Sequence, residues 1–267
     1  MKFSSQGAKN IPSNVLDMLR SVTGIGDAEA WSNILSLVGK GEHDSLKWWL
    51  CEDGGSVYGY NASLSYDFRS RGRTIGLFGA TTHHGGKPVG DAQELFAEFV
   101  KLGGEDLAPL SKDCAKDKDA GTTLCKKIEQ IAADPRWILA QWNQLMSNGG
   151  SGYVYESMRI CKKRGIEKPS ALTIAALYDC SMNQGATGDE GSRKIAQKVA
   201  ASIKDEKAFL AEFLAQRKPI AGTNAYNSPP VNGKNRVQQF IDLLEGGCMD
   251  LKDCDAQIEK ATSWEMK

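Results

Sequence analysis

The sequence predicts an α+β fold that is mostly helical, and three observations support this. Apolar residues recur at the 3.6-residue helical period along most of the 267 residues. The stretch 54–82 breaks this period and is rich in Gly, Tyr, Ser and Thr, as short strands joined by turns are. The chain has 267 residues and no internal repeat, and at this length the helices and the one small sheet should form one large domain or two small lobes.

Two amphipathic helices are predicted before the sheet. The first begins after Pro12 and carries four apolar residues at helical spacing: Val15, Leu16, Leu19 and Val22. The second carries a similar set: Trp31, Ile34, Leu35 and Val38. We expect Gly39 and Gly41 to end this second helix, because glycine readily adopts the left-handed conformation that closes many helices.

Helices are also predicted after the sheet of two or three short strands in 54–82. Asp91, with Glu94 three residues later, resembles a capping box and should begin a helix that Gly103 and Gly104 end. Residues 104–120 are predicted to be a charged loop, and 218–235 an irregular one. Apolar periodicity predicts the remaining helices at 124–133, 137–146, 153–161, 170–182, 192–203, 206–217 and 236–244.

The composition argues against two classes of partner. The 33 Lys and Arg residues balance the 33 Asp and Glu residues, so no net positive charge favours nucleic acid. No run of about 18 apolar residues occurs, so no membrane-spanning helix is expected. The first residues lack the apolar segment of a signal peptide, and we expect the mature chain of a secreted protein.

The seven cysteines predict at least one disulfide. Cys114 and Cys125 bracket a charged loop, whereas Cys248 and Cys254 bracket a short turn. Both spacings suit local disulfides better than metal sites, which usually show Cys-x-x-Cys or histidine partners. A disulfide implies an extracellular setting. The alternative is a cytosolic protein in which the cysteines are buried free thiols.

Two stretches, 37–48 and 66–82, carry the residues that point to chemistry. Each places one carboxylate, Glu42 or Asp67, where a regular element gives way to a glycine-rich turn. Hydrolysis of a glycosidic bond needs one carboxyl group that donates a proton and one carboxylate that activates water. The helix end before Glu42 should raise its pKa, whereas the arginines that follow Asp67 should keep Asp67 ionised.

Each of these residues also has a purely structural interpretation. Glu42 would then be a solvated residue in a helix-ending turn, and Asp67 a turn aspartate that accepts backbone N–H groups. Glu52 and Asp53 are alternatives to Asp67 as the base. Thr74 is either an ordinary β-branched strand residue or the residue that positions the attacking water.

Short motifs follow one another in the order found in a known family. The first half contains these: Leu37-Val38, Glu42, Ser45-Leu46-Lys47-Trp48, Asp67, Arg71-Gly72-Arg73-Thr74 and Gly90-Asp91. The second half contains these: Tyr178-Asp179, Arg193-Lys194, Phe213-Leu214, Arg217-Lys218 and Asn235-Arg236-Val237. The chain thus resembles the family 46 chitosanases of the glycoside hydrolases over residues 31–251. It departs from them in the 25-residue spacing of its two carboxylates and in an insert at 83–89.

The resemblance implies a lysozyme-like fold with a substrate cleft between two lobes. The single catalytic domain 1–267 would comprise a sheet-bearing lobe over 43–90 and a helical lobe over 104–251. The implied activity is endo-hydrolysis, with inversion, of the β-1,4 bonds between glucosamine units of chitosan. The implied protein is a secreted monomer that needs no metal or organic cofactor and binds neither nucleic acid nor membranes.

The resemblance also implies three groups of site residues. The catalytic group is Glu42 as the acid, Asp67 as the base, and Thr74. The substrate-binding group is Asp91, Arg71 and Trp48, with Asp91 gripping a glucosamine ammonium. A charge network that supports the acid consists of Asp179, Arg217 and Arg236. In a simpler interpretation, compatible with the first, Asp91 is a helix cap.

Two other functions remain as alternatives. One is a lysozyme-like hydrolase of peptidoglycan, and the other is a non-catalytic carbohydrate-binding protein on the same fold. Asp91 argues against the first, because a carboxylate that binds an ammonium group has little use against N-acetylated sugars. The presence of both Glu42 and Asp67 argues against the second.

Overall fold

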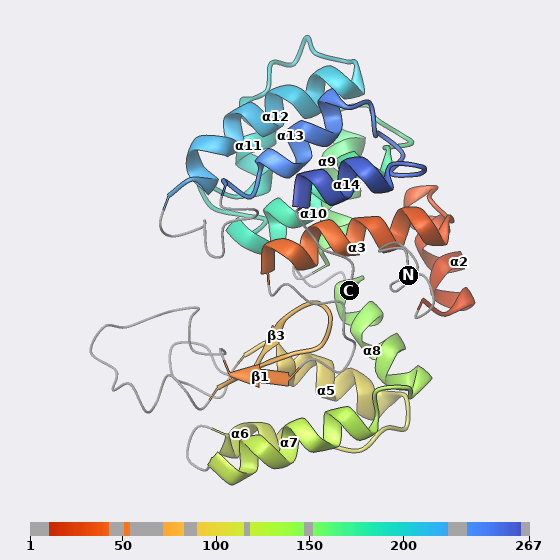
Figure 1. Ribbon diagram of the computed structural model, residues 1–267, viewed down its shortest axis with the longest axis vertical. Coiled ribbons are helices and arrows are strands. Elements are labelled where there is room, and N and C mark those ends of the chain that lie inside the picture. Colours follow the sequence, from red (N-terminus) through yellow and green to blue (C-terminus); the bar gives the residue numbers. More distant parts are fainter. Residues whose placement is uncertain are drawn as a thin grey trace. The chain divides into compact units, whose positions relative to one another are not determined.

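The protein is described by a computed structural model that covers residues 11–42, 51–53, 72–82, 90–114, 118–146, 152–223 and 234–262. It divides into two compact units. The helical unit comprises Met1–Asp44 and Met146–Lys267, and the sheet unit comprises Ser45–Leu145. Helices dominate and one small sheet is present, which confirms the predicted α+β class (Figure 1). None of the helices in the described ranges is long and apolar enough to span a membrane.

The regular elements in the described part of the helical unit are all helices. In chain order they are α2 (Ser13–Thr23), α3 (Ala28–Glu42), α9 (Tyr153–Lys163), α10 (Ala171–Gln184), α11 (Ser192–Lys198), α12 (Glu206–Ala221), α13 (Gln238–Glu245) and α14 (Asp255–Thr262). The sequence predicted all of these except α14. Only part of α14 is buried, since its core residues are Ile258, Ala261 and Thr262.

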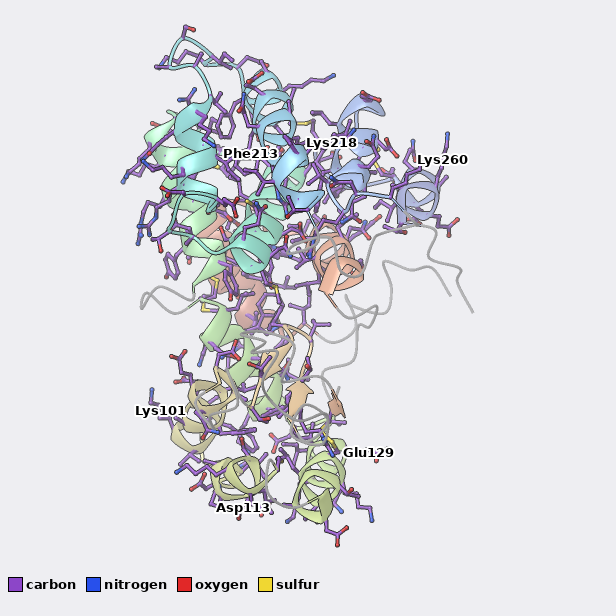
Figure 2. All side chains as sticks on the ribbon, turned by 90° about the vertical axis from the view of Figure 1, so that its left-hand side faces the viewer. Lys101, Asp113, Glu129, Phe213, Lys218 and Lys260 are labelled. Atoms are coloured by element: carbon purple, nitrogen blue, oxygen red, sulfur yellow. A yellow bond between two sulfur atoms is a disulfide. The ribbon has the colours of Figure 1, made fainter. Side chains whose placement is uncertain are left out.

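The centre of the helical unit is α10, in which twelve of fourteen residues are buried. A helix that is buried on all sides belongs to a core rather than to a surface. Ser170 caps its first turn by accepting a hydrogen bond from the Thr173 N–H. α10 packs against both α3 and α9 (Figure 1). Side chains of other helices complete this core, such as Phe213 of α12, whereas Lys260 of α14 is exposed (Figure 2).

Three predicted helix ends in this unit are wrong. α3 continues through Gly39 and Gly41 as far as Glu42. Glycine lowers helix stability by about 1 kcal/mol but does not forbid the helical conformation. α12 continues through Pro219, which removes one backbone hydrogen bond in the last turn, and the helix ends two residues later at Ala221. α11 ends at Lys198 rather than at residue 203, because the backbone of Val199 has an extended conformation.

The sheet unit combines a three-stranded antiparallel sheet with four helices of the described ranges. The elements are β1 (Cys51–Asp53), β2 (Arg73–Ile75), β3 (Ala80–Thr81), α5 (Ala92–Lys101), α6 (Ala108–Asp113), α7 (Lys118–Gln130) and α8 (Pro135–Leu145). The strand order is β1-β2-β3, so β2 is central. The predicted number of strands is confirmed, although β1 lies just before the expected stretch. The predicted charged loop at 104–120 is wrong, since it contains α6 and the start of α7.

Aromatic side chains build the core of the sheet unit. Trp137 of α8 is fully buried, stacks on Phe96 at 6.4 Å and meets Phe99 edge-on at 5.4 Å between ring centroids. Trp142 is also fully buried. Both tryptophans therefore serve the core, while charged residues such as Lys101 cover the outside (Figure 2).

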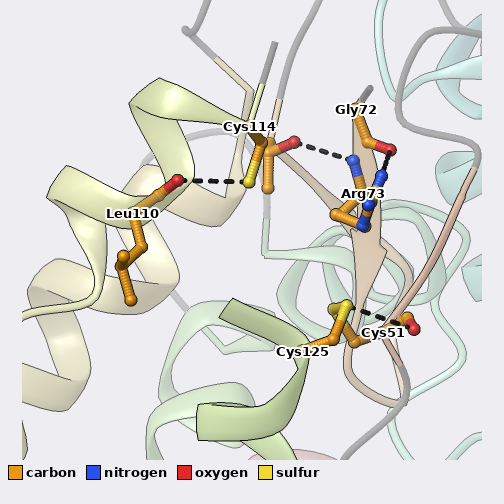
Figure 3. Close-up of a disulfide and its surroundings, with 7 residues drawn as sticks. Cys51, Gly72, Arg73, Leu110, Cys114 and Cys125 are labelled. Carbon is orange, nitrogen blue, oxygen red and sulfur yellow. Dashed lines mark hydrogen bonds between the residues drawn. A yellow bond between two sulfur atoms is a disulfide. The ribbon is translucent and has the colours of Figure 1, made fainter. Parts of the chain in front are cut away.

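A disulfide between Cys51 and Cys125 joins β1 to α7 (Figure 3). At least one disulfide was predicted and is confirmed, but both predicted local pairs are wrong. Cys114 is a buried free thiol that donates a hydrogen bond to the Leu110 carbonyl. Cys248 and Cys254 are free and buried as well. Burial, reinforced by the neighbouring Cys248, raises the pKa of Cys254 to about 12, which keeps this thiol protonated.

Candidate active site

The predicted acid, Glu42, is the last residue of α3, and its side chain lies outside the described residues. The helix that carries it is firmly held. Its apolar face is buried in the helical unit: Trp31, Ile34, Leu35, Leu37 and Val38. Gln239 of α13 donates a hydrogen bond of 3.1 Å to the Leu37 carbonyl, little more than one turn before Glu42. The backbone that presents Glu42 is therefore fixed from a second helix.

Three predicted site residues cannot be placed. Asp67, Arg71 and Trp48 lie outside the described residues, so the separation of the two predicted catalytic carboxylates stays a prediction. The alternative bases Glu52 and Asp53 lie in β1, where the backbone but not their side chains is described.

Thr74 occupies the middle of the central strand. Its Cα partners are Glu52 in β1 and Thr81 in β3. The hairpin that contains it is held by α8, because Gln141 accepts a hydrogen bond of 2.8 Å from the Leu77 N–H in the β2–β3 turn. Thr74 is partly buried. It is thus a strand residue in a rigid setting, and its role with water stays a prediction.

Asp91 precedes α5, but its side chain makes no capping hydrogen bond, so the predicted cap is wrong. One carboxylate oxygen, Oδ1, instead accepts hydrogen bonds from the Thr81 N–H at 2.5 Å and the Thr81 hydroxyl at 3.1 Å. Gln144 of α8 donates to the Asp91 carbonyl at 2.8 Å. Competition from the Thr81 donors explains why this aspartate ties α5 to β3 rather than capping its own helix.

The environment of the Asp91 carboxylate acts on its pKa in two opposite directions. Desolvation raises the pKa of Asp91 above its usual value, while the two Thr81 hydrogen bonds act in the opposite direction. The residue as a whole is nevertheless exposed. Asp91 can therefore meet a ligand at the surface from a position fixed by β3.

A buried charge network lies inside the helical unit. The guanidinium groups of Arg217 and Arg236 each contact one oxygen of Asp179 at 2.6 Å, and all three side chains are 0 % exposed. Arg217 also donates to Gln184 Oε1 at 2.8 Å. Arg236 was expected to pair with Glu42 or Asp179, and it pairs with Asp179; support of the acid by this network stays a prediction. Asp179 comes from α10, Arg217 from α12, and Arg236 lies two residues before α13, so the network links three elements around the core helix.

Arg73 has a role that the sequence did not reveal. We expected it to act with the other arginines that follow Asp67, yet it begins β2 and is buried. A Cβ on Gly121 would lie only 2.5 Å from its Nη2 atom, so Arg73 lies against the backbone of α7. Its Nη1 atom donates to the Gly72 carbonyl at 3.1 Å (Figure 3). The sequence offered no signal for this contact, because Gly121 lies between the predicted loop at 104–120 and the predicted helix at 124–133.

Metal binding finds no support in the described ranges. No group of three or more His, Cys, Asp or Glu side chains gathers there in a way that could hold a metal ion. Polar groups do converge at the Asp91–Thr81 pair in the sheet unit, and in the helical unit at the Asp179 network and around Glu156.

Comparison with known proteins gives a consistent result. The chain matches no protein-family model. It is 34 % identical over 271 residues to a chitosanase from Niallia circulans, covering 97 % of this chain and 84 % of that protein.

Solved structures with the same fold share much less sequence. A family 46 chitosanase from Gynuella sunshinyii in complex with chitotetraose has a TM-score of 0.57 at 19 % identity, covering 83 % of this chain and 89 % of that one. A native chitosanase from Bacillus subtilis MY002 has a TM-score of 0.56 at 20 % identity, covering 82 % and 89 %. A mutant of that enzyme was solved with six GlcN units.

Proposed function

The chain belongs to the family 46 chitosanases, and we propose that it hydrolyses internal β-1,4 bonds between glucosamine units of chitosan with inversion. The observation that carries this proposal is the 34 % identity to a chitosanase along nearly the whole chain. The likeness in fold to chitosanases solved with glucosamine oligosaccharides agrees with it.

In the proposed reaction, one carboxyl group donates a proton to the substrate and the other accepts a proton from water. The Glu42 carboxylic acid donates its proton to the glycosidic oxygen as the bond from that oxygen to C1 breaks. The Asp67 carboxylate takes a proton from a water molecule whose oxygen attacks C1 from the opposite face. The product has the inverted anomeric configuration, and exchange with solvent restores both groups.

The position of Glu42 supports its role as the acid. It is the last residue of α3, and the partial negative charge of a helix C-terminus raises the pKa of a carboxyl group. An acid must keep its proton near neutral pH in order to donate it. The hydrogen bond from Gln239 to Leu37 supports the same role, because it limits movement of the helix that presents Glu42.

For the base, Asp67 is the first candidate and Glu52 the second. Thr74, which we propose to orient the attacking water, is the Cα partner of Glu52 in the sheet. If Asp67 does not act as the base, Glu52 is therefore the alternative base, because it lies beside the residue proposed to orient the water.

We propose that Asp91 binds the ammonium group of a glucosamine unit, with Arg71 and Trp48 as further substrate contacts. Two features of Asp91 favour this: the residue is exposed, and Thr81 fixes one of its oxygens at 2.5 and 3.1 Å. Preorganised acceptors bind a cation without first having to be ordered. A peptidoglycan hydrolase would have no use for this charge, because its sugars are N-acetylated.

We also propose that the enzyme is secreted and acts as a monomer. The disulfide between Cys51 and Cys125 supports secretion, because disulfides persist in oxidising compartments and are rare in the cytosol.

The test of this function combines one substitution with three substrates. Glu42→Gln removes the proton and little volume, so the protein should fold normally while its kcat on highly deacetylated chitosan falls about 10²–10⁴-fold. Wild-type enzyme should release oligomers from chitosan and none from chitin or peptidoglycan. Proton NMR of the first products should show the α anomer, since inversion of a β bond produces it.

Three outcomes would contradict the proposal. Release of products from peptidoglycan in preference to chitosan would favour the lysozyme-like alternative. A Glu42→Gln variant with more than about a tenth of the wild-type kcat would reject Glu42 as the acid. If Asp67→Asn retains activity and Glu52→Gln loses it, the base is Glu52.

A further inference from the structure

The helical unit contains a pocket that the proposed activity does not use. Its volume is about 370 Å³, and its lining comes from α9, from α11 and from the residues that follow α11. This size lies within the usual range of small-molecule sites. Six of the lining side chains are charged: Glu156, Arg159, Lys163, Arg164, Arg193 and Lys198.

The single carboxylate among them is already neutralised. Glu156 accepts hydrogen bonds from Arg193 to both of its oxygens, each at 2.6 Å, and from Arg159 at 3.1 Å. Its side chain is only 6 % exposed. Charge-assisted bidentate pairs of this kind are among the stronger polar contacts in proteins. Glu156 therefore cannot offset the remaining cations, and the pocket keeps a clear excess of positive charge.

Arg164 contributes a cation whose protein partners are neutral. Its guanidinium group donates to the carbonyl oxygens of Val199, Ala200 and Ile203 at 3.3, 2.7 and 3.2 Å. These bonds fix the backbone after α11, which forms one wall of the pocket. The Nε atom of Arg164 is buried and has no hydrogen-bond partner among the residues that the structure describes. Such a buried donor without a partner is rare in folded proteins.

Apart from Gln197, the uncharged residues of the lining are apolar. Ile160, Ala196 and Val199 are all buried and belong to the lining. Cations beside an apolar surface suit an anion that carries an apolar group, because the apolar part displaces water and thereby strengthens the charge interactions. Chitosan is a polycation and would be repelled here. The pocket is thus chemically opposite to a glucosamine subsite.

From these observations we infer that this pocket binds a small amphipathic anion, namely an organic phosphate with a compact apolar group. The anionic group would meet the ends of Lys163, Lys198 and Arg159, and the apolar group would lie against Ile160 and Val199. This site is independent of the proposed catalytic residues, none of which lines it.

The test is calorimetric titration of the full chain with phenyl phosphate at constant ionic strength. We expect saturable binding of one molecule per chain, with inorganic phosphate and phenol both binding more weakly. The double variant Lys163→Gln/Lys198→Gln should weaken binding about tenfold or more, since each lysine offers a charge-assisted hydrogen bond. Both lysines are exposed, so the fold should be preserved.

The matched control is Lys162→Gln, which removes the adjacent exposed lysine of α9 that does not line the pocket. It should bind phenyl phosphate like wild type, and all variants should hydrolyse chitosan equally. Absence of saturable binding up to ~10 mM would overturn the inference. So would equal affinities of the double variant and the control. Equal affinity for inorganic phosphate would overturn the assignment of an apolar group.

Discussion

Replacing Arg236 by methionine tests how much the buried charge network contributes. The Arg236→Met variant keeps most of the side-chain volume but removes one of the two cations that contact Asp179 at 2.6 Å. Breaking a buried ion pair typically costs about 3–5 kcal/mol, because the remaining charge cannot be solvated. Arg217 still neutralises Asp179 in this variant, so we expect the lower end of that range, about 3 kcal/mol.

Asp179→Asn should be far more damaging than Arg236→Met. It leaves two fully buried guanidinium groups without a carboxylate, and the loss of both pairs would cost about 6–10 kcal/mol. This is comparable with the whole free energy of unfolding of a typical protein, about 5–15 kcal/mol. Comparing the losses of unfolding free energy in Arg236→Met and Asp179→Asn therefore shows how much stability depends on the carboxylate that both arginines share.

Thermal unfolding measures the loss of stability in Arg236→Met. For chains of this size, 1 kcal/mol shifts Tm by about 2–4 °C, so Arg236→Met should melt about 6–12 °C below wild type. Lys252→Met is the control in the same unit, because its ion pair with Asp27 is 43 % and 38 % exposed. Exposed pairs contribute little, and its Tm should hardly change.

Two results would refute this reasoning, one for each part of it. An Arg236→Met variant that melts within ~2 °C of wild type would show that the pair is not energetically important. Separately, kcat should be measured well below the lowered Tm, where the variant is folded. An unchanged kcat there would reject the idea that the network supports the acid, whatever the effect on stability.

Further predictions concern the sheet unit. Asp91→Asn should weaken binding of a glucosamine hexamer to the Glu42→Gln protein without loss of stability, because an amide oxygen can still accept from Thr81; equal affinities would exclude ammonium recognition. Since desolvation raises the pKa of Asp91, this contribution should disappear on acidification at a higher pH than for an ordinary aspartate. Removing the disulfide by Cys51→Ser/Cys125→Ser opens a loop of 74 residues and should cost about 4 kcal/mol in urea unfolding, and an unchanged midpoint would contradict this. Gly76 and Gly165 both have positive φ, 72° and 78°, but a Cβ would clash only at Gly76, where it would lie 2.4 Å from Gln141 Oε1. Gly76→Ala should therefore lower Tm more than Gly165→Ala, and equal Tm values would contradict this.

The sequence was most informative where periodicity and packing agree. The helices around Leu19, Trp31 and Phe96 were predicted because their apolar residues repeat at the helical period, and these residues are buried. Helix ends were predicted less well. Gly39 and Gly41 predicted a stop that the packing of α3 overrides, which local propensity alone cannot reveal.

Contacts between distant segments could not be predicted in the same way. Cys125 pairs with Cys51, 74 residues away, although a nearer cysteine was available. The bond from Asp91 to Thr81 depends on the position of β3, which no local pattern encodes. The Asp179 network was predicted only through the resemblance to a family, because three residues from distant segments give no spacing signal.

The burial of α10 has a consequence for how the helical unit opens. Twelve of its fourteen residues are buried, and it packs against α3, α9, α11, α12 and α13. No partial opening can expose such a helix while its neighbours stay in place. Its amide protons should therefore exchange with solvent only when the whole unit unfolds, and their exchange rates report the global stability of that unit. Hydrogen exchange of the α10 amides can therefore measure the free energy of unfolding of the helical unit without denaturant.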